Sequence, residues 1–186
     1  QDMVNLKAMK IKSGHIKVQS QKEGITLLYD NLGLTDRELK KTLCKIGAIG
    51  AEGSINGSLS NLTTQLSLGG DIGQIKANLS FTGDSTFTLM SGKGDIDCQR
   101  VNAALILGEN SPIGVVDFSA QVTGKTRKGK LHEAKLMSQI DHLDLLQYSY
   151  NDIAIDLKMK DGCYSGDIQL HDPCGEIDIN GAIKPL

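Results

Sequence analysis

The sequence predicts a mainly β protein: one long, curved antiparallel sheet folded as a U-shaped groove with an apolar interior, accompanied by one or two short helices. Apolar and polar residues alternate along most of the chain, and Gly, Asn, Asp and Ser separate the alternating runs. Only 3 prolines and no tryptophan occur among the 186 residues. Such alternation is typical of strands that present one apolar face.

The clearest local signal is Asp161-Gly162, which lies between two alternating runs and favours a two-residue hairpin turn. That turn sets Ile155 opposite Ile168, and a second turn at 172–175 returns a third strand. Both turns independently place the apolar residues on one side, so we expect a three-stranded meander. Its apolar face comprises Ile153, Ile155, Leu157, Met159, Tyr164, Ile168, Leu170, Ile177, Ile179 and Ile183.

The same alternation recurs upstream of the meander. After Phe81, a turn at 83–85 is expected to return Phe87 and Leu89 on the matching face, while Ile11 and Ile16 should face each other across a turn at 13–14. We expect roughly ten to twelve strands in all. The upstream part of the apolar face comprises Leu66, Leu68, Ala77, Leu79, Phe81, Phe87, Leu89, Phe118, Ala120 and Val122.

Helical signals are few. The segment 35–45 opens with Thr35-Asp36-Arg37-Glu38, which fits a capping box, and the segments 100–107 and 143–147 are weaker candidates. The segments 35–98 and 99–186 show a low-resolution similarity that suggests an internal repeat. We treat 1–186 as a single β-groove segment excised from a longer protein.

A sheet with one apolar face must cover that face. The few helices are too small for this, and small inward residues such as Gly166, Gly181 and Ala77 disfavour a sandwich with large interdigitating side chains. The pattern therefore favours a curled sheet with space inside, where each buried methylene of an acyl chain would contribute roughly 0.8 kcal/mol. A closed, dry β-sandwich serving a structural role is the alternative.

The stretch 148–186 combines a tyrosine-containing lead, the run Tyr164-Ser165-Gly166, an Asp172-Pro173 turn and Gly181. This order resembles the C-terminal repeats of the TamB and AsmA-like family of Bacteroidetes, although Cys174-Gly175 departs from the pattern. The resemblance implies a β-taco groove in a periplasmic protein anchored in the inner membrane of a Gram-negative bacterium.

The resemblance also implies a function. The groove would conduct phospholipid acyl chains between the inner and outer membranes in outer-membrane biogenesis, with an outer-membrane TamA-like barrel protein as a partner and no catalytic residues. The alternative within this setting is a scaffold that assists outer-membrane protein assembly or secretion by strand pairing. No apolar run reaches the roughly 18 residues of a spanning helix, so the membrane anchor is expected outside this segment.

Signals for chemistry are weak throughout. A net charge of −2 and few aromatic residues argue against a nucleic-acid partner. His132-Glu133 lacks the second histidine of a zinc-protease motif, and the nearby residues His171, Asp172 and Cys174 are better explained by a tight turn. Cys163 and Cys174 should lie at opposite ends of one strand, too far apart to pair. We expect no enzyme activity, no metal and no cofactor.

Overall fold

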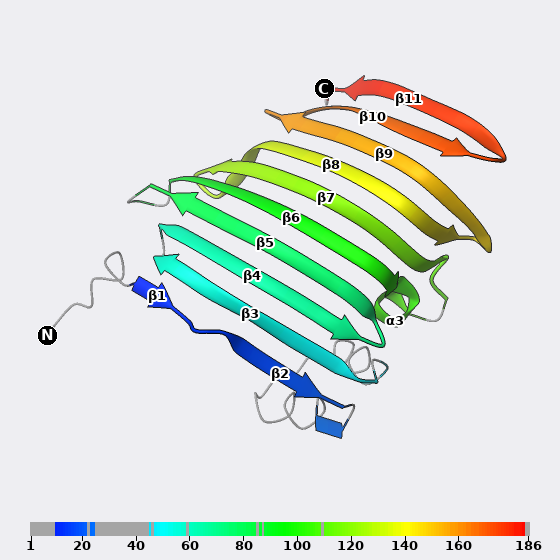
Figure 1. The fold of residues 1–186 in the computed structure, drawn as a ribbon. Helices are drawn as coiled ribbons and strands as arrows, with labels where there is room; N and C mark the ends of the chain where they lie inside the picture. The colour runs from blue at the N-terminus through cyan, green and yellow to red at the C-terminus, as the bar shows by residue number, and fades with distance from the viewer. Residues whose placement is uncertain are drawn as a thin grey trace, which may run out of the picture.

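A computed structural model describes residues 10–21, 23–24, 45, 47–58, 60–84, 86, 88–108 and 110–184. These residues form one antiparallel sheet of 11 strands and the short helix α3 (Figure 1). The expected fold class and strand number are confirmed. The elements are β1 (Lys10–Lys12), β2 (Ile16–Ser20), β3 (Ile49–Ser58), β4 (Asn61–Gly70), β5 (Gly73–Gly83), β6 (Leu89–Asn102), α3 (Ala103–Leu107), β7 (Ile113–Arg127), β8 (Lys130–Leu145), β9 (Tyr148–Lys160), β10 (Cys163–Asp172) and β11 (Gly175–Ile183).

From β3 to β11 each strand pairs with its neighbours in the sequence, so the sheet is a continuous meander. The C-terminal part has the register that its turns predicted: Ile168 lies between Ile155 and Ile179. The turn residues Asp161 (φ 51°) and Gly162 (φ 80°) both have positive φ, as the two-residue hairpin requires.

The first strand pair differs from the expectation. Ile11 pairs with Gly57 and Ile16 pairs with Gly53, so β1 and β2 lie end to end along β3 and do not face each other. The cause is Ser13, whose backbone N–H donates to the Ile55 carbonyl (2.8 Å) and whose hydroxyl accepts from the Ile55 N–H (2.7 Å). These bonds keep the chain running along β3.

The helical expectations are only partly met. The segment 100–107 begins as the end of β6, passes a β-bulge at Arg100 (φ 50°), and becomes α3 from Ala103 onward. The segment 143–147 is not helical, because β8 continues to Leu145 and Leu146-Gln147 form a turn with positive φ. The helix expected over 35–45 lies, except for Lys45, outside the described residues.

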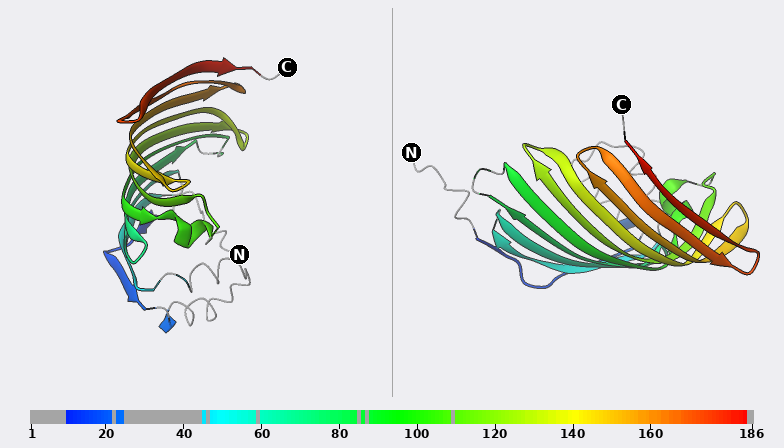
Figure 2. Two further views of the ribbon diagram at one scale, coloured as in Figure 1. Left: turned by 90° about the vertical axis from the view of Figure 1, so that its right-hand side faces the viewer. Right: turned by 90° about the horizontal axis from the view of Figure 1, so that it is seen from above.

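The sheet is curved and remains open, with β11 at one edge and β1 and β2 at the other (Figures 1 and 2). Figure 2 shows α3 on the concave side, where it packs against β7. Cys98 and Val101, which point to the apolar face beside α3, are among the few buried residues, together with Ile72, Ala103 and Ala120. The apolar face is therefore the inner face of the curve.

The hairpin turn at Asp161-Gly162 can be tested by adding one methyl group. Replacing Gly162 with Ala should lower the free energy of unfolding by about 1 kcal/mol, because an L side chain is strained at its φ of 80° although no atom lies within 4 Å of the new Cβ. Gly181 is the matched control, since it is equally open but has no positive φ. Urea unfolding should show little loss for Gly181→Ala; equal losses for both variants would contradict the turn.

Candidate functional site: the apolar inner face

Cross-strand pairing brings the apolar residues into rows that run across the sheet, perpendicular to the strands. Each residue of a row lies opposite the next, from β4 to β11. One row consists of Leu66, Ala77, Ile96, Ala120, Ser138, Ile155, Ile168 and Ile179. The next consists of Leu68, Ile75, Cys98, Phe118, Ile140, Ile153, Leu170 and Ile177.

Two further rows complete the face towards the β9–β10 turn. The third row contains Leu79, Val122 and Leu157, and the fourth contains Phe81, Met159, Tyr164 and Ile183. All the described residues assigned to this face from the sequence thus lie on it, except Leu89. Phe87 lies outside the described residues.

Leu89 was wrongly placed on this face. Its N–H donates to the Asp84 carboxylate (3.2 Å) and its carbonyl accepts from the Asp84 N–H (3.0 Å), so Asp84 lies opposite Leu89. The turn is therefore wider than the one expected at 83–85, and Met90, not Leu89, pairs with Gly83. A shift of one residue moves a side chain to the other face, and Leu89 joins Ser91 and Lys93 there.

Several residues of the rows were not singled out from the sequence. Ile75, Ile96 and Ile140 follow the same alternation as their neighbours, and their position in the period-two pattern was the signal that could have found them. They close the gaps between the expected residues. With them, the rows contain no charged side chain from β4 to β11.

Large side chains on this face remain accessible. Phe81 is 44% exposed, Leu157 39% and Ile179 56%, although each belongs to a row of apolar neighbours. Within the described part of the chain, no second sheet covers them. An accessible apolar surface of this extent is typical of a face that binds an apolar partner.

Glycines on neighbouring strands keep the face smooth. A Cβ added at Gly94 would lie 2.7 Å from a Leu79 methyl carbon, and one added at Gly166 would lie 2.4 Å from a Leu157 methyl carbon. Both leucines therefore lie flat across the glycine of the next strand. The space expected at Gly166 is occupied by Leu157, whereas Gly181 has no atom within 4 Å of its added Cβ.

The outer face is polar and contains ion pairs. Asp156 lies 3.6 Å from Lys135 and 3.5 Å from Lys158. A shallow depression of about 840 Å³ crosses its middle, lined by residues including Asp97, Gln121, Gln139, Asp156, Asp167 and Gln169. In the part of the chain that the structure describes, no group of three or more His, Cys, Asp or Glu side chains is arranged to hold a metal ion.

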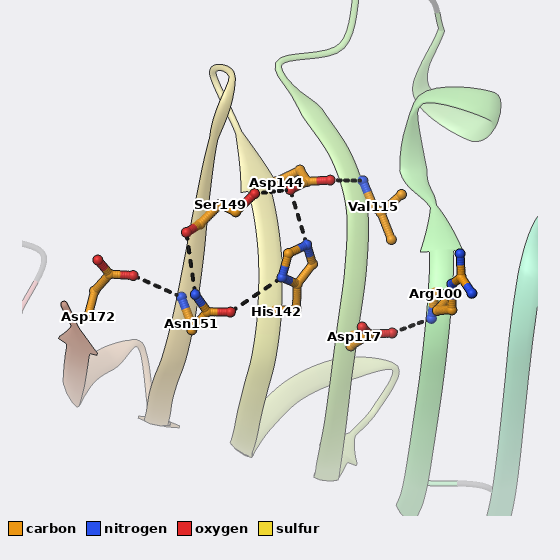
Figure 3. Close-up of polar contacts among 8 residues, drawn as sticks. All are labelled: Arg100, Val115, Asp117, His142, Asp144, Ser149, Asn151 and Asp172. Atoms are coloured by element: carbon orange, nitrogen blue, oxygen red, sulfur yellow. Dashed lines mark hydrogen bonds and ion pairs between the residues drawn. The ribbon is translucent and has the colours of Figure 1, made fainter. Parts of the chain in front are cut away.

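A belt of hydrogen bonds ties β7, β8 and β9 together at one end of the strands (Figure 3). Asp144 accepts from the Ser149 hydroxyl (2.6 Å) and the Val115 N–H (3.4 Å), and it contacts His142 (3.1 Å). His142 reaches Asn151 with its other ring nitrogen (3.3 Å). The hydrogen bond from Ser149 holds the pKa of Asp144 below its usual range.

This belt does not have the arrangement of a catalytic triad. In a triad the histidine lies between the serine and the carboxylate and takes the serine proton. Here Asp144 lies between Ser149 and His142, so the histidine has no contact with the hydroxyl. The belt therefore serves to join strands. A similar contact joins β6 to β7, where the Arg100 backbone N–H donates to the Asp117 carboxylate (Figure 3).

The turn at 172–175 is built around Asp172. Its carboxylate accepts from the Tyr148 hydroxyl (2.6 Å), the Cys174 N–H (2.9 Å) and the Asn151 N–H (3.2 Å). The Tyr148 hydrogen bond lowers the pKa of Asp172, and the same bond raises the pKa of Tyr148. Cys163 and Cys174, at opposite ends of β10, are both free thiols.

Acid should weaken this turn through Asp172. Because its pKa is lowered in the folded chain, the contact stabilises the fold above the pKa of an unfolded aspartate, about 3.9, and the stabilisation disappears as the pH falls through the lower folded value. Amide exchange of β10 and β11 should therefore accelerate on going from neutral pH to acid, after correction for intrinsic rates. Tyr148→Phe should shift this acceleration to higher pH; an unchanged profile would show that the hydrogen bond is not formed.

No helix of the described residues is long and apolar enough to span a membrane. Comparison of the chain with profiles of known protein families, with characterised proteins and with solved structures finds no match. The geometry of the inner face therefore carries the functional argument.

Proposed function

We propose that the chain is a non-catalytic lipid-binding segment whose apolar inner face holds the acyl chains of phospholipids. The observation that carries the proposal is the set of four apolar rows without a charged side chain, which runs across the strands and stays accessible. A row of this kind matches an extended acyl chain in shape and polarity.

The free energy of burying methylene groups favours an acyl chain as the occupant. At roughly 0.8 kcal/mol for each buried methylene, a common acyl chain would gain on the order of 10 kcal/mol before the costs of immobilisation. Most side chains of the rows lack hydrogen-bonding groups; the exceptions include Tyr164 and Ser138, whose hydroxyl already donates to the Ser119 carbonyl (2.9 Å). Binding would depend on apolar area, so the face would select acyl chains without selecting one headgroup.

The rows also suit movement along the sheet. Strand neighbours are about 4.8 Å apart, so a chain lying along a row meets a similar environment at each step. In this proposal the segment belongs to a periplasmic protein anchored in the inner membrane, and conducts phospholipid towards the outer membrane, with a TamA-like barrel as partner. The resemblance of 148–186 to TamB and AsmA-like repeats supports that setting.

A second function, strand pairing with a nascent outer-membrane protein, is favoured by the edge at β11. All nine residues of β11 are exposed, its register with β10 is regular, and its other edge is unpaired among the described residues. Such an edge can accept another strand. The structural sandwich is disfavoured, because the part of the chain described holds a single sheet.

The two faces can be compared directly at adjacent positions. Ile155 lies on the inner face, and Ala154 points to the outer face. With a lipid carrying a photoreactive group on its acyl chain, Ile155→Asp should reduce crosslinking by at least about tenfold, since the carboxylate would have to be desolvated against the lipid. Ala154→Asp is the control and should leave crosslinking nearly unchanged.

Both variants should first be shown to fold by circular dichroism and urea unfolding. Native mass spectrometry of the gently purified wild-type chain should reveal bound phospholipid. Unchanged crosslinking in folded Ile155→Asp, or complete absence of lipid in repeated preparations, would contradict the proposal.

A further inference from the structure

Basic residues are concentrated at one end of the strands. β5, β7, β9 and β11 all end on the same side of the sheet, at the left of Figure 1. At this side the β7–β8 hairpin and the end of β9 form a basic rim, which we define as Lys125, Arg127, Lys128, Lys130, Lys158 and Lys160. Carboxylates such as Asp71, Asp144 and Asp172 lie towards the other end of the strands.

Most of the positive charge of the basic rim is not neutralised locally. Lys125 pairs with Glu133 (2.9 Å) and Lys158 pairs with Asp156 (3.5 Å), while the nearby Asp161 pairs with His132 (2.6 Å). Among the described residues, Arg127, Lys128 and Lys130 have no ion pair. These three residues occupy the tip of one hairpin.

Exposed apolar side chains border the same rim. On the inner face, Phe81 is 44% exposed, Leu131 56% and Tyr164 54%. Leu131 directly follows Lys130, and its methyl carbon lies 3.6 Å from the position of a Cβ on Gly124, so it belongs to the inner face. The fourth apolar row therefore lies beside the cationic hairpin.

A hollow of about 480 Å³ lies between the β5–β6 turn and the β7–β8 hairpin. Its lining combines Leu89 and Met90 with Lys125, Arg127 and His132, besides the Asp84 carboxylate. That carboxylate is already engaged by the Leu89 N–H (3.2 Å) and the Thr86 hydroxyl (2.9 Å). The hollow thus adds a mixed apolar and cationic surface to the rim.

We propose that the basic rim docks on the surface of a bilayer that contains anionic lipids. Lysine and arginine are attracted to the negative surface potential, while adjoining aliphatic and aromatic side chains insert at the headgroup level. The exposed Phe81, Leu131 and Tyr164 favour a bilayer over a purely ionic partner. The acidic opposite end of a second copy is the main competitor for the same charge.

Docking at the rim does not depend on the proposed function. Only its consequence, the transfer of lipid onto the sheet, rests on that function. If the inner face holds acyl chains, docking at the rim brings the margin of the apolar face, along the fourth row, to the membrane, so a lipid can pass onto the sheet there. Docking itself requires no lipid on the inner face. The two ideas can therefore fail separately.

The test is cosedimentation of the full chain with vesicles of phosphatidylcholine alone or mixed with phosphatidylglycerol, at low and high salt. The wild type should bind the mixed vesicles more tightly, and salt should weaken this binding. The double variant Lys128→Glu, Lys130→Glu should lose at least about tenfold in affinity for them. The control Lys17→Glu, Lys76→Glu carries the same charge change away from the rim and should lose less than about twofold.

Three results would overturn the inference: equal binding of both vesicle types by the wild type, wild-type affinity in the rim variant, or an equal loss in the control. A rim variant that changes the sedimentation mass of the chain but not vesicle binding would assign the rim to a second copy, and also overturn it. Fluorescence of cis-parinaric acid, a monomeric fatty acid, reports on the inner face separately. The rim variant should keep that signal; its absence in every protein would remove the proposed function and leave the rim test standing.

Discussion

Hydrogen bonding between neighbouring strands is the constraint on which the rest of this structure depends. Side chains alternate between faces with a period of two, so one slipped residue would send a whole strand's apolar side chains outward. Among the described strands, register irregularities occur only in the β6–β7 and β7–β8 pairings, near Cys98, Ile113, Asp117 and Lys125. At each, an added residue restores the alternation. The apolar rows stay aligned across the sheet as a result.

Packing on the inner face follows from the same register. Because a leucine on one strand lies opposite a glycine on the next, its side chain can cover that glycine instead of projecting from the sheet. Leu79 over Gly94 and Leu157 over Gly166 are the clearest pairs. A second layer would normally supply the contacts that such leucines lack. Here they obtain part of them within the sheet, which keeps a single curved layer compatible with an accessible apolar face.

The fold was predictable where turns are specified by short-range chemistry. Asp161-Gly162 determines its own geometry, and together with the turn at 172–175 it predicted the register of the C-terminal meander. Prediction failed where a side chain forms a hydrogen bond with the backbone of a neighbouring strand. The bond between Asp84 and Leu89 widens one turn, so Leu89 was predicted on the wrong face. The bond between Ser13 and Ile55 keeps the chain extended where a reversal was expected. Neither hydrogen bond has a signature in the alternation of apolar residues.

The site was only partly predictable for a related reason. The apolar rows could be inferred strand by strand. The basic rim could not, because it forms only when pairing places Lys158 and Lys160 of β9 beside the first residues of β8, which begins at Lys130. A net charge of −2 hides this, since it sums over both ends of the strands. The basic run from Lys125 to Lys130 is visible in the sequence, but its position beside the end of β9 is not.

The meander has a consequence for how such a protein can grow. Strands contact chiefly their sequence neighbours, so stability is assembled step by step along one dimension, as in repeat proteins. Duplicating one hairpin would extend the surface by two strand spacings, roughly 10 Å, while the faces and ends of all other strands keep their places. The length of the apolar surface is thus a quantity that insertion or deletion of hairpins can set independently of its width.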